Sequence, residues 1–264
     1  MKPLSTFSAV IRRDVRGVFF DIDDTLTTDG RLTAQAYGAL EDLAAAGVLT
    51  VPITGRPAGW CDHIASMWPV DGVVGENGAF YFVYDRGGRK MQRRFLSSDG
   101  QRRDARARLD SLKKTILAEV PGSAVSSDQH YRETDLAIDF CEDVSRLSQS
   151  AVDRIVALFE SAGASAKVSS IHVNGWFGTY DKLGMTKVLM RECFRVDLDA
   201  DKEHFVFVGD SPNDAPMFGF FPHSVGVANV RDFDEPPMPG PTYVCEGRCG
   251  EGFVEIADAL LAVR

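Results

Sequence analysis

The chain of 264 residues is 44% hydrophobic, which is enough for one large or two modest globular domains with a real core. Its formal net charge of -9 argues against general binding to nucleic acid or to an anionic membrane, because such binding depends on Lys and Arg. The chain opens without a secretory signal, and no apolar run approaches the roughly 18 residues of a membrane span, so we expect a soluble, cytoplasmic protein.

In the first and last parts of the chain, short apolar runs alternate with stretches whose apolar residues have helical spacing. The pattern predicts, in chain order, a strand at 15–20, a helix at 33–46, a strand at 48–53, a helix at 58–67, a hairpin around 76–78, strands at 204–210 and 224–229, and a helix at 252–263. Thr33 is suited to cap the first helix and Gly47 to end it. This alternation is typical of an α/β protein with a doubly wound, parallel, Rossmann-like sheet.

The middle of the chain has a different texture. It is predicted to hold strands at 90–96, 135–141 and 167–174 and helices at 102–119 and 146–162. We expect a catalytic core at 1–84 and 179–264, with an α+β cap domain inserted at 85–178. The window 85–114 holds 11 Lys or Arg against 4 Asp, and it is either a solvated face or a surface that attracts anionic substrates or a partner.

Polar side chains gather at the carboxyl ends of the predicted parallel strands, where open sheets bind ligands. Asp21 and Asp23 follow the first strand, and Thr54 follows the second. The segment 209–214 follows a late strand, and Lys182 is placed to open a helix that starts at the same edge. We expect these side chains to share one site.

The acids of this set are suited to bind a metal ion. Residues two apart in an extended segment point the same way, so Asp21 and Asp23 can share one face. With Asp210 from a neighbouring strand they make an oxygen-rich site suited to Mg²⁺, which takes one or two carboxylates and keeps several waters. The cation would offset the repulsion between the carboxylates.

A carboxylate can also act as a nucleophile, forming an aspartyl phosphate that divides one difficult displacement into two easier ones. That role falls to Asp21, which leads the motif, while Asp23 would protonate the leaving alcohol and later deprotonate the attacking water. The Thr54 hydroxyl, the Lys182 ammonium and backbone N–H groups can neutralise the phosphoryl group. Thr25 is expected to fix the turn by hydrogen bonding.

Four motifs in this order resemble those of the haloacid dehalogenase superfamily. They are Asp-Ile-Asp-Asp-Thr at 21–25, Ile-Thr-Gly-Arg-Pro at 53–57, Lys182, and Gly-Asp-Ser-Pro-Asn-Asp at 209–214. Only 28 residues separate Thr25 from Thr54, whereas 127 separate Thr54 from Lys182, so the cap lies between the second and third motifs. This placement, with Gly-Glu-Asn-Gly-Ala at 75–79, resembles the type-two capped, Cof-like subgroup, which includes sugar phosphatases, sucrose phosphatase and eukaryotic-type phosphomannomutases.

The resemblance implies a role for each matching residue. The implied metal ligands are the carboxylates of Asp21 and Asp210 and the backbone carbonyl of Asp23, with Asp214 in the metal shell. The implied phosphate-binding residues are Thr54, Gly55, Lys182 and Asn213. Lys187 is a rival for Lys182, because both follow the inserted segment; we favour Lys182 because Tyr-Asp stands directly before it at the start of a helical stretch.

His172 and Asn174 stand where the chain returns from cap to core, and they either line the substrate pocket or belong to a packed strand. Taken together, the motifs predict a Mg²⁺-dependent phosphatase for a small phosphorylated metabolite, with a sugar phosphate as the favoured substrate. The alternatives are a phosphomutase that uses the same site and a non-catalytic protein that binds a phosphorylated ligand. We expect a small-molecule phosphate ester as the partner, with no nucleic acid and no membrane, and the sequence does not indicate an oligomeric state.

Overall fold

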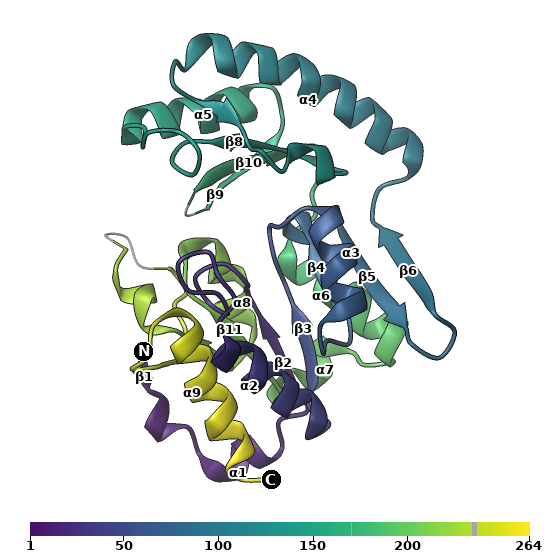
Figure 1. Ribbon diagram of the computed structural model, residues 1–264, viewed down its shortest axis with the longest axis vertical. Helices are drawn as coiled ribbons and strands as arrows, with labels where there is room; N and C mark the ends of the chain where they lie inside the picture. The colour runs from purple at the N-terminus through teal and green to yellow at the C-terminus, as the bar shows by residue number, and fades with distance from the viewer. Residues whose placement is uncertain (170, 234–236) are drawn as a thin grey trace.

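The structure, a computed structural model, describes residues 1–169, 171–233 and 237–264. Its central layer is a six-stranded sheet in which every neighbouring pair is parallel and the order is β1-β13-β12-β11-β2-β3 (Figure 1). These strands are β1 (Lys2–Pro3), β2 (Gly17–Phe20), β3 (Leu49–Pro52), β11 (Phe205–Gly209), β12 (His223–Gly226) and β13 (Tyr243–Val244). The predicted α/β fold with a doubly wound parallel sheet is confirmed.

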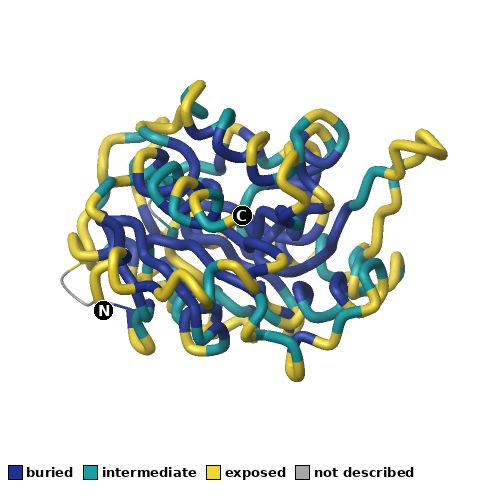
Figure 2. The backbone as a smooth tube through the Cα atoms, turned by 90° about the horizontal axis from the view of Figure 1, so that it is seen from below, coloured by how far each residue is buried: buried dark blue, intermediate teal, exposed yellow. Residues whose placement is uncertain are grey.

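Helices cover both faces of this sheet. They are α1 (Ala9–Arg13), α2 (Ala34–Ala45), α3 (Ala58–Met67), α6 (Lys182–Leu189), α7 (Leu198–Asp201), α8 (Ala215–Phe220) and α9 (Cys249–Leu261). The helices α2, α3 and α9 contribute to one apolar cluster, and α6 and α8 contribute to another. Val18 and Phe20 of β2 belong to the first cluster and Phe19 to the second, which explains why this strand is an unbroken apolar run. Figure 2 shows buried backbone in the middle of the molecule and exposed backbone around it.

A three-stranded antiparallel sheet extends the core beyond β3. It consists of β4 (Val73–Gly75), β5 (Phe80–Asp85) and β6 (Lys90–Phe95), and a parallel bridge between Ile53 and Val74 joins it to the end of β3. The predicted hairpin around 76–78 is therefore present. The strand predicted at 90–96 pairs with β5, so it belongs to this three-stranded sheet beside the core and not to the inserted domain.

A separate four-stranded sheet, which we call the second sheet, is antiparallel and has the order β7-β8-β10-β9. Its strands are β7 (Ala124–Val125), β8 (Asp135–Asp139), β9 (Ser165–Val168) and β10 (His172–Trp176), and its helices are α4 (Asp99–Glu119) and α5 (Gln149–Ser161). The helices pack on one face, where they share an apolar cluster with Leu136, Ile138 and Val173. Because side chains alternate along a strand, the opposite face carries the polar residues, and that face turns toward the core (Figure 1).

Several predicted boundaries differ from the structure. The single strand predicted at 167–174 is wrong: this stretch contributes to two strands, β9 and β10, that pair with each other, and residue 170 between them lies outside the described residues. The strand predicted at 224–229 ends at Gly226, and a short helical turn begins at Ala228. The last helix starts at Cys249, three residues earlier than expected.

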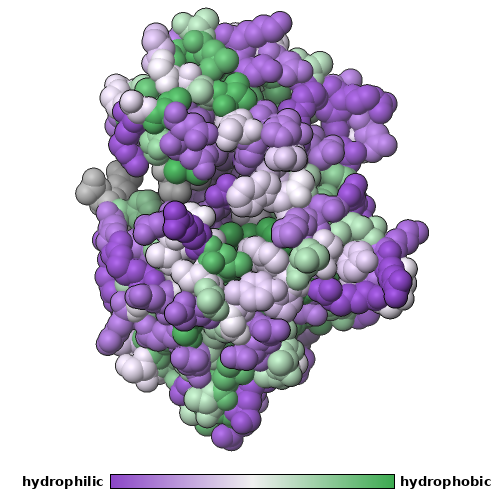
Figure 3. Space-filling model, viewed as in Figure 1, coloured by the Kyte–Doolittle hydropathy of each residue, from purple (hydrophilic) through white to green (hydrophobic). Residues whose placement is uncertain are grey.

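The basic window 85–114 is mostly a solvated face. Helix α4 buries Leu109, Leu112 and Ile116 and exposes much of the rest, and Figure 3 shows hydrophilic residues gathered over this helix. The guanidinium of Arg102 lies 3.7 Å from the ring centre of Phe95, so this arginine is positioned by a cation–π contact. Within the described residues, no helix has the length and apolar character needed to cross a membrane.

Glu76 joins the second sheet to the core. It is fully buried in the turn between β4 and β5, and its carboxylate accepts a hydrogen bond of 3.0 Å from the backbone N–H of Ala58. It also accepts from the backbone N–H groups of Glu133 and Thr134, at 2.9 and 2.7 Å, and from the Thr134 hydroxyl. One buried carboxylate thus holds the start of α3 and the loop before β8 together.

We expect Glu76→Ala to lower the free energy of unfolding by about 3 kcal/mol, because it leaves two buried N–H groups and one partly buried N–H group without an acceptor. For a chain of this size that corresponds to a melting temperature roughly 6–12 °C lower in a calorimetric scan. Glu160→Ala is the matched control, since Glu160 is exposed on α5. Equal melting temperatures for the two variants would contradict this role.

Candidate active site

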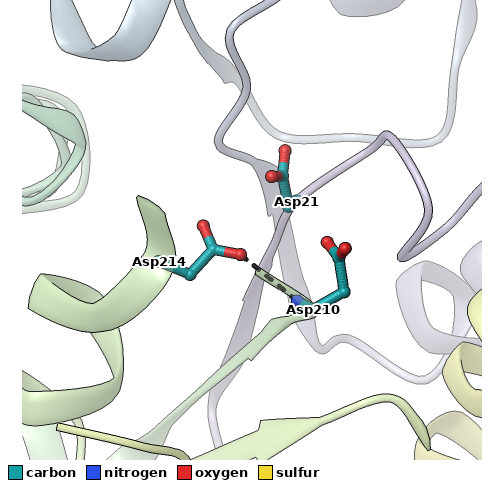
Figure 4. A group of neighbouring side chains, drawn as sticks. All are labelled: Asp21, Asp210 and Asp214. Carbon is teal, nitrogen blue, oxygen red and sulfur yellow. Dashed lines mark hydrogen bonds between the residues drawn. The ribbon is translucent and has the colours of Figure 1, made fainter. Parts of the chain in front are cut away.

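Three carboxylates lie together at the carboxyl edge of the parallel sheet. Asp21 follows β2, Asp210 follows the adjacent strand β11, and Asp214 ends the helical turn Pro212–Asp214. One oxygen from each lies within 4.8 Å of the others, and all three side chains are buried. Figure 4 shows the carboxylates around a common space, with Asp214 accepting a hydrogen bond of 3.2 Å from the backbone N–H of Asp210.

Lys182 supplies a buried positive charge to this cluster. It is the first residue of α6, and its Nζ donates to Asp21 Oδ2 and to Asp214 Oδ1, both at 2.8 Å. Asp181 caps the helix, and the backbone of Gly78 approaches it so closely that a Cβ there would lie 2.0 Å from the Asp181 carbonyl oxygen. An ammonium carries three N–H bonds, so one remains for another acceptor.

Thr25 holds Asp210 instead of the turn that we expected it to fix. Its Oγ1 donates to Asp210 Oδ1 at 2.8 Å, across two neighbouring strand ends. The hydroxyl of Thr27 makes the turn contact, donating to the Ile22 carbonyl at 3.0 Å. The Thr that ends the first motif therefore fixes the direction of a carboxylate that lies 185 residues away in the chain.

Burial and crowding shift the pKa values in the cluster. Burial raises the pKa of Asp21 to about 7, although Lys182 acts in the opposite direction. Burial, followed by repulsion from Asp214 and Asp21, raises the pKa of Asp210 well above its usual value. Despite burial, the pKa of Lys182 rises because both neighbouring carboxylates favour its charged form. The cluster is short of positive charge, so a divalent cation bound by oxygen ligands fits this set of donors.

The side chain of Asp23 is not part of the cluster of three and pairs with Arg56. The guanidinium Nε lies 3.0 Å from both Asp23 carboxylate oxygens, and Nη2 lies 2.6 Å from Oδ1. Arg56 also lies 4.4 Å over the ring of Trp60. Asp23 keeps 31% of its side chain exposed, so its direction is fixed while it remains accessible from the cavity.

The predicted phosphate-binding residues surround the same place. Thr54 is fully buried, and its Oγ1 accepts a hydrogen bond of 3.1 Å from the backbone N–H of Arg56, which leaves its hydroxyl proton free to donate. Gly55 and Asn213 line the cavity beside the carboxylates. Ser211 donates to Asn213 Oδ1 at 2.7 Å, so the amide nitrogen of Asn213 is the group left to donate.

The structure separates the two rival lysines. The Nζ of Lys187 lies 2.6 Å from Asp199 Oδ1 and 4.3 Å from the ring centre of Phe220, and its side chain is partly exposed. Lys182 is buried and contacts Asp21 directly. This geometry supports the preference for Lys182.

One cavity joins the strand ends of the core to the polar face of the second sheet. It is lined by Asp21, Asp23, Gly55, Arg56, Asn77, Arg132, Lys167, Ser169, Ile171, His172, Asn174, Asp210, Ser211 and Asn213. His172 and Asn174 therefore reach the same space as the acids of the first motif. Figure 3 shows a hollow on this face between the upper and lower parts of the molecule.

Arg132 closes one side of the cavity. Its Nη1 donates to the backbone carbonyl of Gly55 at 3.1 Å and contacts Asp135 at 3.1 Å, while its Nε donates to Asp128 at 3.0 Å. Attraction to Asp135 and Asp128 outweighs burial and raises the pKa of Arg132. A cation from the loop before β8 is thus bound to the loop that carries Thr54.

Sequence reasoning missed the cationic side chains of the cavity. Arg56 could have been found, since it directly follows Thr54 and Gly55 in the second motif. Lys167 could have been found only with the register of β9 against β10. Arg132 carries no local signal, because its partner Gly55 lies 77 residues earlier in the chain.

This chain is similar in sequence or in fold to several known proteins. A phosphoglycolate phosphatase from Haloarcula marismortui is 25% identical over 244 residues, which cover 92% of this chain and 96% of the relative. Protein 0175 of Thermoplasma acidophilum aligns with a TM-score of 0.71 at 18% identity, covering 95% of this chain and 99% of that one. The sucrose-phosphatase of Synechocystis sp. PCC6803, solved with sucrose and phosphate, aligns with a TM-score of 0.63 at 14% identity, covering 93% and 98%.

The two structural alignments, at such low identity, establish a shared fold. The family model described as haloacid dehalogenase-like hydrolase matches residues 15–219, a span that includes every motif listed from the sequence. Because this match extends over well more than half of the sequence, the chain belongs to the haloacid dehalogenase-like hydrolase family.

Proposed function

We propose that the protein is a Mg²⁺-dependent phosphatase that hydrolyses a small phosphorylated metabolite through an aspartyl phosphate on Asp21. The observation that carries this proposal is the Lys182 ammonium, which lies 2.8 Å from both Asp21 and Asp214 in a buried cluster of carboxylates beside a cavity. The family is one of hydrolases and the curated relative is named a phosphatase, which bears out the prediction of a phosphoric monoester hydrolase.

The carboxylates of Asp21, Asp210 and Asp214 would hold the cation, because they offer hard oxygen ligands within 4.8 Å of one another. The backbone carbonyl of Asp23 is the further ligand that we propose. When bound, Mg²⁺ would neutralise charge on the phosphoryl group and on the acids around it. Family membership is consistent with a divalent cation, and the choice of Mg²⁺ rests on the all-oxygen donor set.

Two displacements would then complete the reaction. In the first, a carboxylate oxygen of Asp21 attacks phosphorus, the ester bond breaks, and Asp23 gives its proton to the leaving alcohol. In the second, Asp23 takes a proton from water, which attacks phosphorus and releases phosphate and the free Asp21 carboxylate. Thr54, Lys182 and Asn213 each retain a donor that can hold the phosphoryl oxygens.

The remainder of the substrate would occupy the cavity below the second sheet. We propose that the inserted segment, expected at 85–178, acts as a cap that determines specificity. Because β6 pairs with β5 beside the core, we propose that this cap begins after Phe95. His172 and Asn174 reach the cavity from β10, which supports a role in substrate binding. A sugar phosphate is one candidate, given the fold shared with a sucrose-phosphatase, and phosphoglycolate, named for the curated relative, is another.

Phosphorus NMR of a hexose phosphate primed with its bisphosphate separates the proposed phosphatase from a phosphomutase. Release of free phosphate supports the hydrolase, whereas an isomerised sugar phosphate supports the mutase. If a generic aryl phosphate is bound in the presence of Mg²⁺ but never cleaved, the chain is a binding protein for phosphorylated ligands instead.

Asp21→Asn should lower turnover by at least about a thousandfold, because an amide oxygen is a poor nucleophile for phosphorus. Phosphate release is the measurement, with protein purified free of wild-type enzyme. Asp104→Asn is the matched control, since Asp104 is exposed on α4, and we expect it to keep the wild-type rate. Normal turnover by Asp21→Asn would rule out the aspartyl phosphate.

Lys182→Met should lower kcat/KM about 100- to 1000-fold, the usual cost of losing one fixed donor to developing charge. Lys187→Met should change it by no more than about threefold, because that side chain contacts Asp199 outside the site. Steady-state kinetics on one phosphate ester compares the two variants. A larger loss in the Lys187 variant would reverse the assignment.

Mg²⁺ should raise the melting temperature of the wild type, since a ligand at 100 times its Kd adds about 2.7 kcal/mol, or roughly 5–10 °C here. Asp210→Asn should lose most of that gain, because one of three carboxylates becomes a neutral amide. Without metal this variant should melt close to the wild type, since the relief of repulsion offsets weaker hydrogen bonds. Equal metal-induced shifts in calorimetry would remove Asp210 from the site.

A further inference from the structure

The face of the second sheet that turns toward the core presents one lysine to the cavity. In the register of the sheet, Lys167 of β9 lies opposite Asn174 of β10, which in turn lies opposite Ala137 of β8. Cross-strand partners share a face, so Lys167 and Asn174 point the same way, and both line the cavity. Val173 points to the opposite side, into the apolar cluster under the helices.

The other cations at the cavity are already neutralised. Arg56 is paired with Asp23, and Arg132 is paired with Asp128 and Asp135. Lys182 lies between two carboxylates of the cluster.

Lys167 differs from these cations, because within the part of the chain that the structure describes its side chain makes no ion pair and no hydrogen bond. It therefore offers an ammonium with three donors to whatever enters the cavity.

His172 also lines this cavity, with the carboxylate of Glu142 beside its ring. It is 3% exposed, and a Glu142 oxygen lies 2.8 Å from its Nε2. Burial lowers the pKa of His172 to about 4, so the ring is neutral and carries one N–H donor.

We propose that Lys167 is a specificity-determining residue that binds a second anionic group of the substrate. This inference rests on the proposed function, in which the transferred phosphoryl group is bound by Lys182, Thr54 and the metal site. The ammonium of Lys167 comes from the opposite wall of the cavity, so it meets the part of the substrate beyond the ester oxygen. The preferred substrate class is then a phosphate ester that carries a carboxylate or a further phosphate.

The chemistry of the wall favours an anion over the hydroxyl groups of a neutral sugar. A hydroxyl both donates and accepts, and it is best matched by a mixture of amides and carboxylates. Lys167 is a donor only, and the Asn174 amide nitrogen is already used by Asp135 at 3.0 Å. An anionic group can accept from Lys167 a hydrogen bond that the positive charge strengthens.

The test compares esters of similar size with and without the second charge. Phosphoglycolate is set against hydroxyethyl phosphate, phosphoglycerate against glycerol phosphate, and a hexose bisphosphate against the hexose monophosphate. The first two pairs probe a carboxylate and the third probes a phosphate. For the wild type we expect kcat/KM to be at least about tenfold higher for the charged member of one pair or more.

Lys167→Ala should lower that preference about tenfold, mainly through KM, and Lys167→Arg should retain most of it. Lys167→Glu should reverse the preference, because like charges repel. Lys114→Ala is the matched control: it removes an exposed lysine on α4, outside the cavity, and should leave the preference unchanged. Circular dichroism and melting temperature check that each variant is folded.

Two failures are distinguishable. If the wild type cleaves esters without regard to the second charge, or if Lys167→Ala keeps the preference, this inference is overturned while the phosphatase stands. If the wild type cleaves no ester, the proposed function fails, and calorimetric titration with phosphoglycolate decides the inference. Weaker binding to Lys167→Ala than to the wild type then supports it, and equal binding refutes it.

Discussion

A single buried ammonium shared by two carboxylates is the interaction on which the site depends. Three carboxylates lie within 4.8 Å of one another and out of water, an arrangement that would cost several kcal/mol per ion if uncompensated. Lys182 offsets part of that charge through contacts of 2.8 Å to Asp21 and Asp214. The remaining deficit of positive charge suits the divalent cation that we propose for this cluster.

The parallel sheet makes this crowding possible. The strands β2 and β11 are neighbours and end at the same edge, so Asp21 and Asp210 meet although they are far apart in the chain. Thr25 then fixes Asp210 by a hydrogen bond of 2.8 Å, and Gly78 leaves room for the start of α6 that carries Lys182. Each of these contacts limits how far the charged groups can move apart. The carboxylates therefore stay close together despite their mutual repulsion.

The core and the cluster of Asp21, Asp210 and Lys182 could be predicted because their signals are local. An apolar run that ends in acids identifies a strand end, and strand ends of a parallel sheet share an edge. The second sheet gave no comparable signal. The stretch 167–174 has no Gly, Pro or Asn before its last residue, and Ser at 169 and 170 is a weaker turn signal, so one strand was expected where two exist. The contact of Arg132 with Gly55 likewise depends on packing between distant segments.

The residues proposed for phosphoryl transfer and those proposed for substrate recognition are thus positioned in different ways. The groups proposed for phosphoryl transfer are fixed by strand ends and helix starts, where a change of one residue disturbs a buried network of charges. The cavity wall is instead the polar face of an antiparallel sheet whose apolar face packs separately under α4 and α5. Because side chains alternate, a substitution at an exposed position such as Lys167 changes what meets the substrate without touching Val173 or its neighbours. Under the role that we propose for Lys167, substrate preference would vary on β9 while the stability of the sheet and the chemistry of the core stay the same.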